Sequence, residues 1–233
     1  NQIAALNTSQ ISSLTTAQVA ALRTHEIAAI ETNDLQAMTT NQFAAMTSTQ
    51  VAALTTAQIG KIETGDIAAL TTTALQGLTT NQISLNNGTT DQISVLTTDQ
   101  LIAMTSSQFA ALKTAVLAAM NTIQINKLEA ADVAALTTAQ MVALATNQIA
   151  ALNTDQIANL KSSQVAALHT DQIAAIETND LQALTTGSFA AMTSAQVAAM
   201  STLQIGKIET GDIAALSTAA LQGLTTNQIS LNN

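Results

Sequence analysis

The sequence predicts an all-α protein, an α-solenoid of very short helices in which two octads, or 16 residues, form one coil of an elongated rod. Two observations lead to this prediction. An eight-residue phrase, such as Thr55 to Ile62, recurs along the whole chain, and its apolar residues are spaced as on one face of a helix. Several residue types also alternate between odd and even copies of the phrase, which indicates two layers of helices.

We label the octad positions a to h. Position a varies, b is Thr or Ser in every complete octad except at Ala130, d is mostly Gln or an acid, e and h are mostly large and aliphatic, and f and g are small. The hydroxyl at b is expected to be the helix N-cap, because Thr and Ser accept hydrogen bonds from the first backbone N–H groups. Where a is also Thr or Ser, the a and d side chains could instead form a capping box, which moves the boundary by one residue. Predicted caps at b include Thr16, Thr56, Thr64, Thr138, Thr154 and Thr210.

Positions e and h lie three residues apart, so they share one face of a single helical stretch. Eight residues at about 100° each turn the pattern by roughly 80° per octad, so one long helix would spread its apolar stripe around the cylinder. A β-helix is disfavoured because f and g are mostly Ala rather than β-branched residues. We therefore expect helices of about six residues, separated by bends near a and b and held together by their neighbours.

The distribution of rarer residues predicts how many octads form one coil. Counted from Asn7, Glu at a falls only in even octads, whereas Phe at e and Lys at g fall only in odd octads. A coil of two antiparallel helices explains this alternation, with odd helices in one layer and even helices in the other. About fourteen such coils, with roughly 8–10 Å between stacked helices, give a rod of about 110–140 Å.

A longer repeat lies over the octads. The stretch Glu31 to Ala37 recurs at Glu177 to Ala183, an offset of 146 residues (177 − 31). We interpret residues 88–233 as one complete repeat unit and residues 1–87 as the C-terminal part of the preceding unit. The octad phase is kept except for a two-residue insertion near 86–88, so we expect a continuous solenoid taken from a longer array.

The composition argues against several functions. A net charge of −9 with 9% charged residues disfavours binding to nucleic acid, which needs clustered Lys and Arg, and to anionic membrane surfaces. Polar residues interrupt every octad, so no apolar run reaches membrane-spanning length and no membrane insertion is expected. The chain has no cysteine, which excludes disulfides and thiolate metal sites. Its seven Met stand at e or h and are predicted to be packing residues.

Concentrated charge occurs only in octads with Glu at a and Asp at d. First-turn acids that complement helix dipoles explain this pattern most simply. Paired carboxylates could also bind calcium, which takes several oxygen ligands. The calcium candidates are Glu63, Asp66, Glu209 and Asp212.

Two other patterns also have simple interpretations. His25 and His169 stand at variable positions, so we expect exposed surface histidines rather than acid–base catalysis. A regular array of Thr could order water and bind ice, but the Thr at b is expected to be engaged in capping, and Lys113 and Lys161 are among the residues that interrupt the Thr at a. No catalytic residue, no cofactor and no enzymatic activity are predicted.

The phrase Thr-Thr-x-Gln-Ile-x-Ala-Leu resembles octapeptide repeat arrays of very large bacterial secreted or cell-surface proteins of the adhesin type, over essentially the whole chain. This resemblance identifies no particular protein and carries no catalytic or binding motif. It implies a non-enzymatic stalk or spacer at an extracellular or cell-surface location, contributing to adhesion or to a matrix scaffold. A solenoid face that binds protein or glycan is the alternative, ice binding is a lesser one, and lateral self-association stays open.

Overall fold

The computed structural model describes residues 2–84 and 95–230. These residues form one 3₁₀ helix, η1 (Ile3–Ala5), and 27 α-helices of four to six residues, and they contain no strand. The all-α architecture of very short helices is therefore confirmed. The insertion predicted near 86–88 lies outside the described residues. Within the described ranges, none of the helices has both the length and the apolar character needed to cross a membrane.

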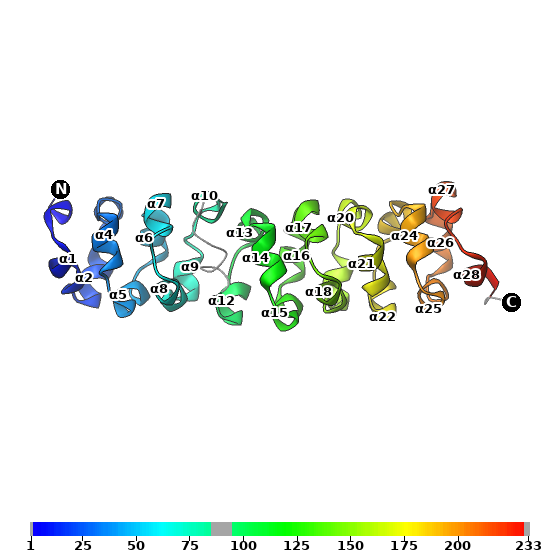
Figure 1. The fold of residues 1–233 in the computed structure, drawn as a ribbon, viewed down its shortest axis with the longest axis horizontal. Coiled ribbons are helices and arrows are strands. Elements are labelled where there is room, and N and C mark those ends of the chain that lie inside the picture. Colours follow the sequence, from blue (N-terminus) through cyan, green and yellow to red (C-terminus); the bar gives the residue numbers. More distant parts are fainter. Residues whose placement is uncertain (1, 85–94, 231–233) are drawn as a thin grey trace. The chain divides into compact units, whose positions relative to one another are not determined.

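The chain divides into two compact units, residues 1–116 and 117–233 (Figure 1). The helix α14 (Thr114–Ala119) crosses this division. The predicted boundary between sequence repeats, at 87/88, falls elsewhere and stays a prediction. The other helices of the first unit are α1 (Thr8–Ser12), α2 (Thr16–Ala21), α3 (Thr24–Ile27), α4 (Thr32–Gln36), α5 (Thr40–Ala44), α6 (Ser48–Ala53), α7 (Thr56–Ile59), α8 (Thr64–Ala69), α9 (Thr72–Leu75), α10 (Thr80–Ser84), α12 (Thr98–Ile102) and α13 (Ser106–Ala111).

The second unit continues the same pattern of one helix per octad. Its helices are α15 (Thr122–Lys127), α16 (Ala130–Ala135), α17 (Thr138–Val142), α18 (Thr146–Ala150), α19 (Thr154–Ala158), α20 (Ser162–Ala167), α21 (Thr170–Ala175), α22 (Thr178–Leu181), α23 (Thr186–Ala190), α24 (Ser194–Ala199), α25 (Thr202–Ile205), α26 (Thr210–Ala215), α27 (Thr218–Leu221) and α28 (Thr226–Ser230). Helix numbers therefore equal octad numbers counted from Asn7.

The N-cap is position a, so the prediction that b caps the helix is wrong. Each predicted cap is instead the first helical residue: Thr16, Thr56, Thr64, Thr138, Thr154 and Thr210. A reciprocal capping box explains the shift by one residue. In α7 the Thr55 N–H donates to Gln58 Oε1 at 2.7 Å, and the Gln58 N–H donates to Thr55 Oγ1 at 3.2 Å. The capping-box alternative is thus confirmed.

This geometry also explains why position a varies. One half of the box needs only the backbone N–H of a, which every residue type except proline supplies. Ala145 has no side-chain acceptor, yet its N–H donates to Gln148 Oε1 at 2.8 Å. The identity of d, rather than that of a, therefore fixes where each of these helices begins.

Two extended residues, h and a, form the corners between helices such as α6 and α7. Leu54 has φ −60° and ψ 138°, and Thr55 has φ −72° and ψ 157°. Neither value requires glycine or proline, which agrees with a chain that has no proline and few glycines. Such a corner redirects the chain but does not reverse it.

Each coil contains three octads, so the predicted coil of two octads is wrong. Helices in contact are three apart along the chain: α5 packs on α8, α18 on α21 and α23 on α26 (Figure 1). Phe43 in α5 and Glu63 at the start of α8 therefore lie on the same side of the first unit. Two antiparallel helices per coil would need a reversal at every corner, and the extended corners do not provide one.

The alternation of Glu, Phe and Lys between even and odd octads consequently does not report layers. At three octads per coil, the 28 octads make about nine coils rather than fourteen. The 146-residue sequence repeat fits this geometry, because its eighteen octads equal six whole coils.

The core consists of positions e and h, as predicted. Phe43, Phe109 and Phe189, all at e, are fully buried. The seven methionines are also buried: Met38, Met46, Met104, Met120, Met141, Met192 and Met200. Position d is buried as well, which the sequence analysis did not anticipate, since a first-turn Gln or Asp was expected to face solvent. Gln50, for example, is only 2% exposed.

Candidate functional site

The buried glutamine at d connects one coil to the coil before it. Gln50 accepts a hydrogen bond from the Thr47 N–H through Oε1 at 2.9 Å. Its Nε2 donates to the carbonyl oxygens of Val19 at 2.8 Å and Leu22 at 2.7 Å, which lie 31 and 28 residues earlier. One amide therefore fixes the start of its own helix and the end of helix α2.

The same two carbonyl bonds recur through both units. They are made by Gln42, Gln50, Gln58, Gln82, Gln148, Gln156, Gln164, Gln172, Gln196, Gln204 and Gln228. The physical reason is the short helix, whose last four carbonyl groups have no partner within the helix itself. Glutamine at d supplies donors to the carbonyls of e and h at each corner, so these buried groups do not remain unpaired.

Octads with Asp at d use a different contact. The b hydroxyl of the octad three before donates to the carboxylate: Thr8 Oγ1 to Asp34 Oδ1 at 2.8 Å, and Thr154 Oγ1 to Asp180 Oδ1. Thr154 was among the predicted caps, and its hydroxyl serves this bond between coils instead. Because b does not cap, the expectation that capping occupies the Thr at b is also wrong; ice binding stays an untested prediction.

The glutamate at a in these octads makes no side-chain capping bond, at Glu31, Glu63, Glu129, Glu177 or Glu209. Burial raises the pKa of the Asp66 carboxyl; a hydrogen bond with Thr40 opposes that rise and the charge of Glu63 adds to it. Asp66 and Asp212 are buried, whereas Glu63 and Glu209 are exposed.

The calcium candidates Glu63, Asp66, Glu209 and Asp212 do not belong to a larger set of ligands. In residues 2–84 and 95–230, no three His, Cys, Asp or Glu side chains gather closely enough to hold a metal ion. Calcium binding stays untested. His25 and His169 are both exposed, as expected.

A second kind of amide stands at f and bonds to the following coil. Gln76 Nε2 donates to the Ala103 carbonyl at 2.9 Å, and Gln182 Nε2 donates to the Lys207 carbonyl at 3.0 Å. Their octads have Ala74 and Asp180 at d, so neither has the usual glutamine there. Asn126, at f of α15, similarly donates to the Ala151 carbonyl at 2.9 Å.

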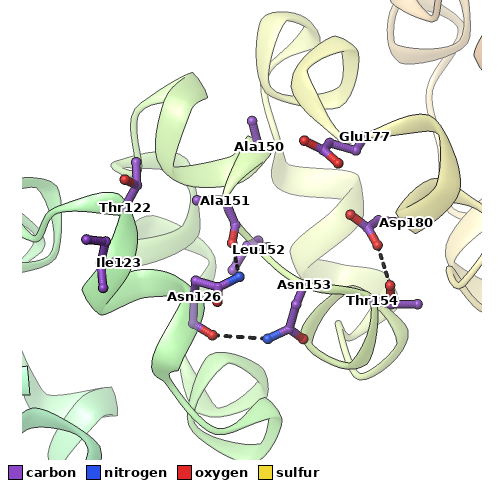
Figure 2. A pocket seen from close by; sticks show the side chains of 10 residues that line it. All are labelled: Thr122, Ile123, Asn126, Ala150, Ala151, Leu152, Asn153, Thr154, Glu177 and Asp180. Atoms are coloured by element: carbon purple, nitrogen blue, oxygen red, sulfur yellow. Dashed lines mark hydrogen bonds between the residues drawn. The ribbon is translucent and has the colours of Figure 1, made fainter. Parts of the chain in front are cut away.

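The largest hollow lies on the second unit, with a volume of about 480 Å³. Thr122 and Ile123 of α15 lie on one side of it, and Glu177 and Asp180 lie on the other (Figure 2). Asn126 also lines it, and the floor between the two sides is formed by Ala150, Ala151, Leu152, Asn153 and Thr154.

Side chains that depart from the octad pattern gather at this hollow. Ile123 is an aliphatic residue at c, and it is 67% exposed. Asn126 replaces the small residue usual at f, and its backbone carbonyl accepts from Asn153 Nδ2 at 3.0 Å (Figure 2). The lining contains two carboxylates and neither a basic nor an aromatic side chain.

Six segments of the chain match the ALTTAQ repeat: residues 27–61, 59–85, 102–138, 125–162, 173–207 and 205–231. Together they cover most of the chain. The chain belongs to the ALTTAQ repeat family. This confirms a repeat array, whereas the bacterial origin and the adhesin link stay proposals. No curated protein matches the chain significantly.

The hexapeptide Ala-Leu-Thr-Thr-Ala-Gln has a direct meaning in this structure. It occurs as Ala53 to Gln58 and as Ala135 to Gln140, where it fills positions g, h, a, b, c and d. The ALTTAQ phrase is thus one corner, followed by the first turn of the next helix and its glutamine at d.

The role of the ALTTAQ glutamine was missed in the sequence, although a signal was present. Glu would form a capping box as well as Gln does. Yet among all octads Glu occupies d only at Glu26, in the first coil, where no earlier coil awaits a donor. A preference for Gln over Glu indicates that the amide N–H₂ group is needed.

Proposed function

We propose that the chain is a non-enzymatic structural segment, a stalk or spacer of a large bacterial extracellular or cell-surface protein that contributes to adhesion or to a matrix scaffold. The observation that carries this proposal is the recurrent glutamine bond. Its donors serve the stacking of coils, and the same contact recurs in both units.

A stack of this kind suits a spacer because each coil contacts only its neighbours. Stability then grows by addition of repeats, and length can change by whole units without redesign of a single core. The 146-residue repeat, equal to six coils, supports this interpretation. The resemblance to adhesin-type arrays supports the extracellular location.

Small-angle X-ray scattering of the 233-residue chain tests the spacer role. A compact domain of this length has a radius of gyration of about 17 Å. We expect a clearly larger value, together with a maximum dimension that increases when one six-coil repeat is added. A value near 17 Å, or no increase, would contradict the spacer role.

The location needs a separate experiment. An antibody raised against the chain is expected to label intact cells of the source organism, or their surrounding matrix, without permeabilisation. Labelling that appears only after permeabilisation would contradict the extracellular location while leaving the spacer role intact.

A further inference from the structure

We propose that the hollow on the second unit binds a primary ammonium group carried on an aliphatic chain, namely the lysine side chain of a partner protein. This proposal goes beyond the spacer role and does not depend on it. It rests on the three chemical features that line the hollow: accessible negative charge, exposed aliphatic surface and the absence of competing cations.

Glu177 supplies the accessible carboxylate. It is exposed, stands at position a of its octad and makes no side-chain hydrogen bond to cap helix α22. Asp180 lies on the same side of the hollow and adds a second negative charge, with Oδ1 accepting from Thr154 (Figure 2). An ammonium group is a compact cation with three donors, which suits a site with two neighbouring carboxylates.

Ile123 supplies the aliphatic surface on the opposite side. Position c of an octad normally carries a small or polar residue, so an isoleucine that is 67% exposed has no role in the core. Ala150 and Ala151 extend the apolar lining between Ile123 and the carboxylates. A lysine side chain matches this arrangement, because its methylene stem covers apolar surface while its charged end reaches a polar group.

Other ligand classes fit less well. The lining has no aromatic side chain on which a sugar ring or a base could stack. Two carboxylates are too few for calcium, which takes six to eight oxygen ligands. Lys127, on the same helix as Ile123, does not line the hollow and so leaves the carboxylates available.

The sequence repeat provides a matched control. Asn7, Thr8, Glu31 and Asp34 lie 146 residues before Asn153, Thr154, Glu177 and Asp180. The bond from Thr8 to Asp34 corresponds to the bond from Thr154 to Asp180. No residue of the chain stands 146 positions before Ile123, so the earlier copy has the carboxylates without the aliphatic side.

Methyl NMR of the isoleucine-labelled chain, titrated with Nα-acetyl-lysine methylamide, tests the proposal. The Ile123 signal is assigned by its loss in Ile123→Val. We expect a saturable shift of this signal, weakened about fivefold or more in Glu177→Gln, the scale of one exposed ion pair. Glu31→Gln should leave the titration unchanged. The norleucine analogue, which lacks the ammonium group, should produce a clearly weaker shift.

Three results would overturn the proposal. The first is an Ile123 signal that does not respond to the lysine probe, and the second is equal binding of the norleucine analogue. The third is a loss of binding in Glu31→Gln as large as that in Glu177→Gln. Circular dichroism of both variants verifies folding, and neither side chain takes part in a capping bond.

Discussion

Octads with glutamine at d and octads with aspartate at d stabilise the contact between coils with opposite hydrogen-bond polarity. Gln50 donates to two carbonyls of the preceding coil, whereas Asp34 accepts from the hydroxyl of Thr8. A carboxylate cannot donate, so it leaves the corner carbonyls to other donors and requires a hydroxyl on the helix beneath it. Both side chains are buried at the same octad position, yet they bond to different parts of the earlier coil.

This difference shows that d is chosen by the neighbouring coil as much as by its own helix. The first coil makes the point directly. Gln18 keeps its capping box, with the Thr15 N–H donating to Oε1 at 2.8 Å, but its side chain is exposed. Gln50, in an octad of similar sequence, is buried and makes the additional carbonyl bonds. The following substitutions test how much these bonds contribute.

The largest effect is expected for Gln50→Ala. This change removes the amide from the buried carbonyls of Val19 and Leu22 and from the Thr47 N–H. Each buried polar group left unpaired costs about 1–3 kcal/mol, so the unit should lose roughly 3–5 kcal/mol of unfolding free energy. Urea unfolding and amide hydrogen exchange at α2 and α6 measure the loss.

Gln18→Ala is the control for that experiment, since it removes only a local capping box in the same unit. Loss of such a cap costs about 1 kcal/mol. Equal effects of the two substitutions would show that the carbonyl bonds contribute little and that d is selected by its own helix alone.

A third kind of octad, with alanine at d, depends on close backbone packing. A Cβ atom at Gly77 would lie 2.0 Å from the Ser48 carbonyl oxygen, and the corresponding distance at Gly223 is 2.1 Å to the Ser194 carbonyl oxygen. Gly77→Ala must therefore push the helices α6 and α9 apart, at a cost of about 1–3 kcal/mol. The thermal unfolding midpoint should fall.

Gly65→Ala gives the opposite sign in the same unit. A Cβ atom there meets nothing within 4 Å, and Gly65 lies inside helix α8. Alanine should stabilise this helix by about 0.5–1 kcal/mol because it restricts the unfolded chain. If both glycine variants destabilise the unit alike, close packing at Gly77 is not the reason for its glycine.

These contrasts also indicate what the sequence could reveal. Period, helix length and the burial of e and h follow from local spacing, so Phe43 and Met46 were assigned to the core correctly. Coil size depends on the corner, where two extended residues such as Leu54 and Thr55 set the direction of the next helix. The positions of Glu, Phe and Lys carry no information about that direction, and their alternation therefore misled.

The cap and the hollow were missed for related reasons. Thr at both a and b makes the N-cap ambiguous, and only the reach of the Gln58 side chain to the Thr55 N–H resolves it. The hollow joins Ile123 to Glu177, which are more than two coils apart in sequence. Without the three-octad coil, no sequence pattern places these residues on neighbouring helices.

A smaller effect is expected where the amide moves to f. Gln182→Ala removes one exposed bond to the Lys207 carbonyl, and a single hydrogen bond of this kind contributes about 0.5–1.5 kcal/mol. Hydrogen exchange at α25 should become faster in this variant. Gln36, its counterpart 146 residues earlier, makes no such bond within the described residues, so Gln36→Ala should leave exchange at α7 unchanged.

The smallest effect concerns two acids at d, Asp66 inside the first unit and Glu26 in its first coil. Burial raises the pKa of Asp66, so the folded state holds its proton more strongly than the unfolded chain does. That contribution to stability is fully present below the unfolded pKa of about 3.9 and is lost as pH rises through the folded pKa. Hydrogen bonds with Arg23 lower the pKa of Glu26, so its contribution is instead lost as pH falls.

Asp66→Asn and Glu26→Gln should therefore change the pH dependence of stability in opposite directions. The asparagine keeps an oxygen acceptor for Thr40 and removes the buried charge, so its stability relative to the original chain should be higher at pH 7 than at pH 3. The Glu26 variant should compare less favourably at pH 7 than at pH 3. Urea unfolding across this range measures both differences. Parallel curves would show that burial at d does not separate the two acids, and the contrast between interior coils and the first coil would then be limited to glutamine.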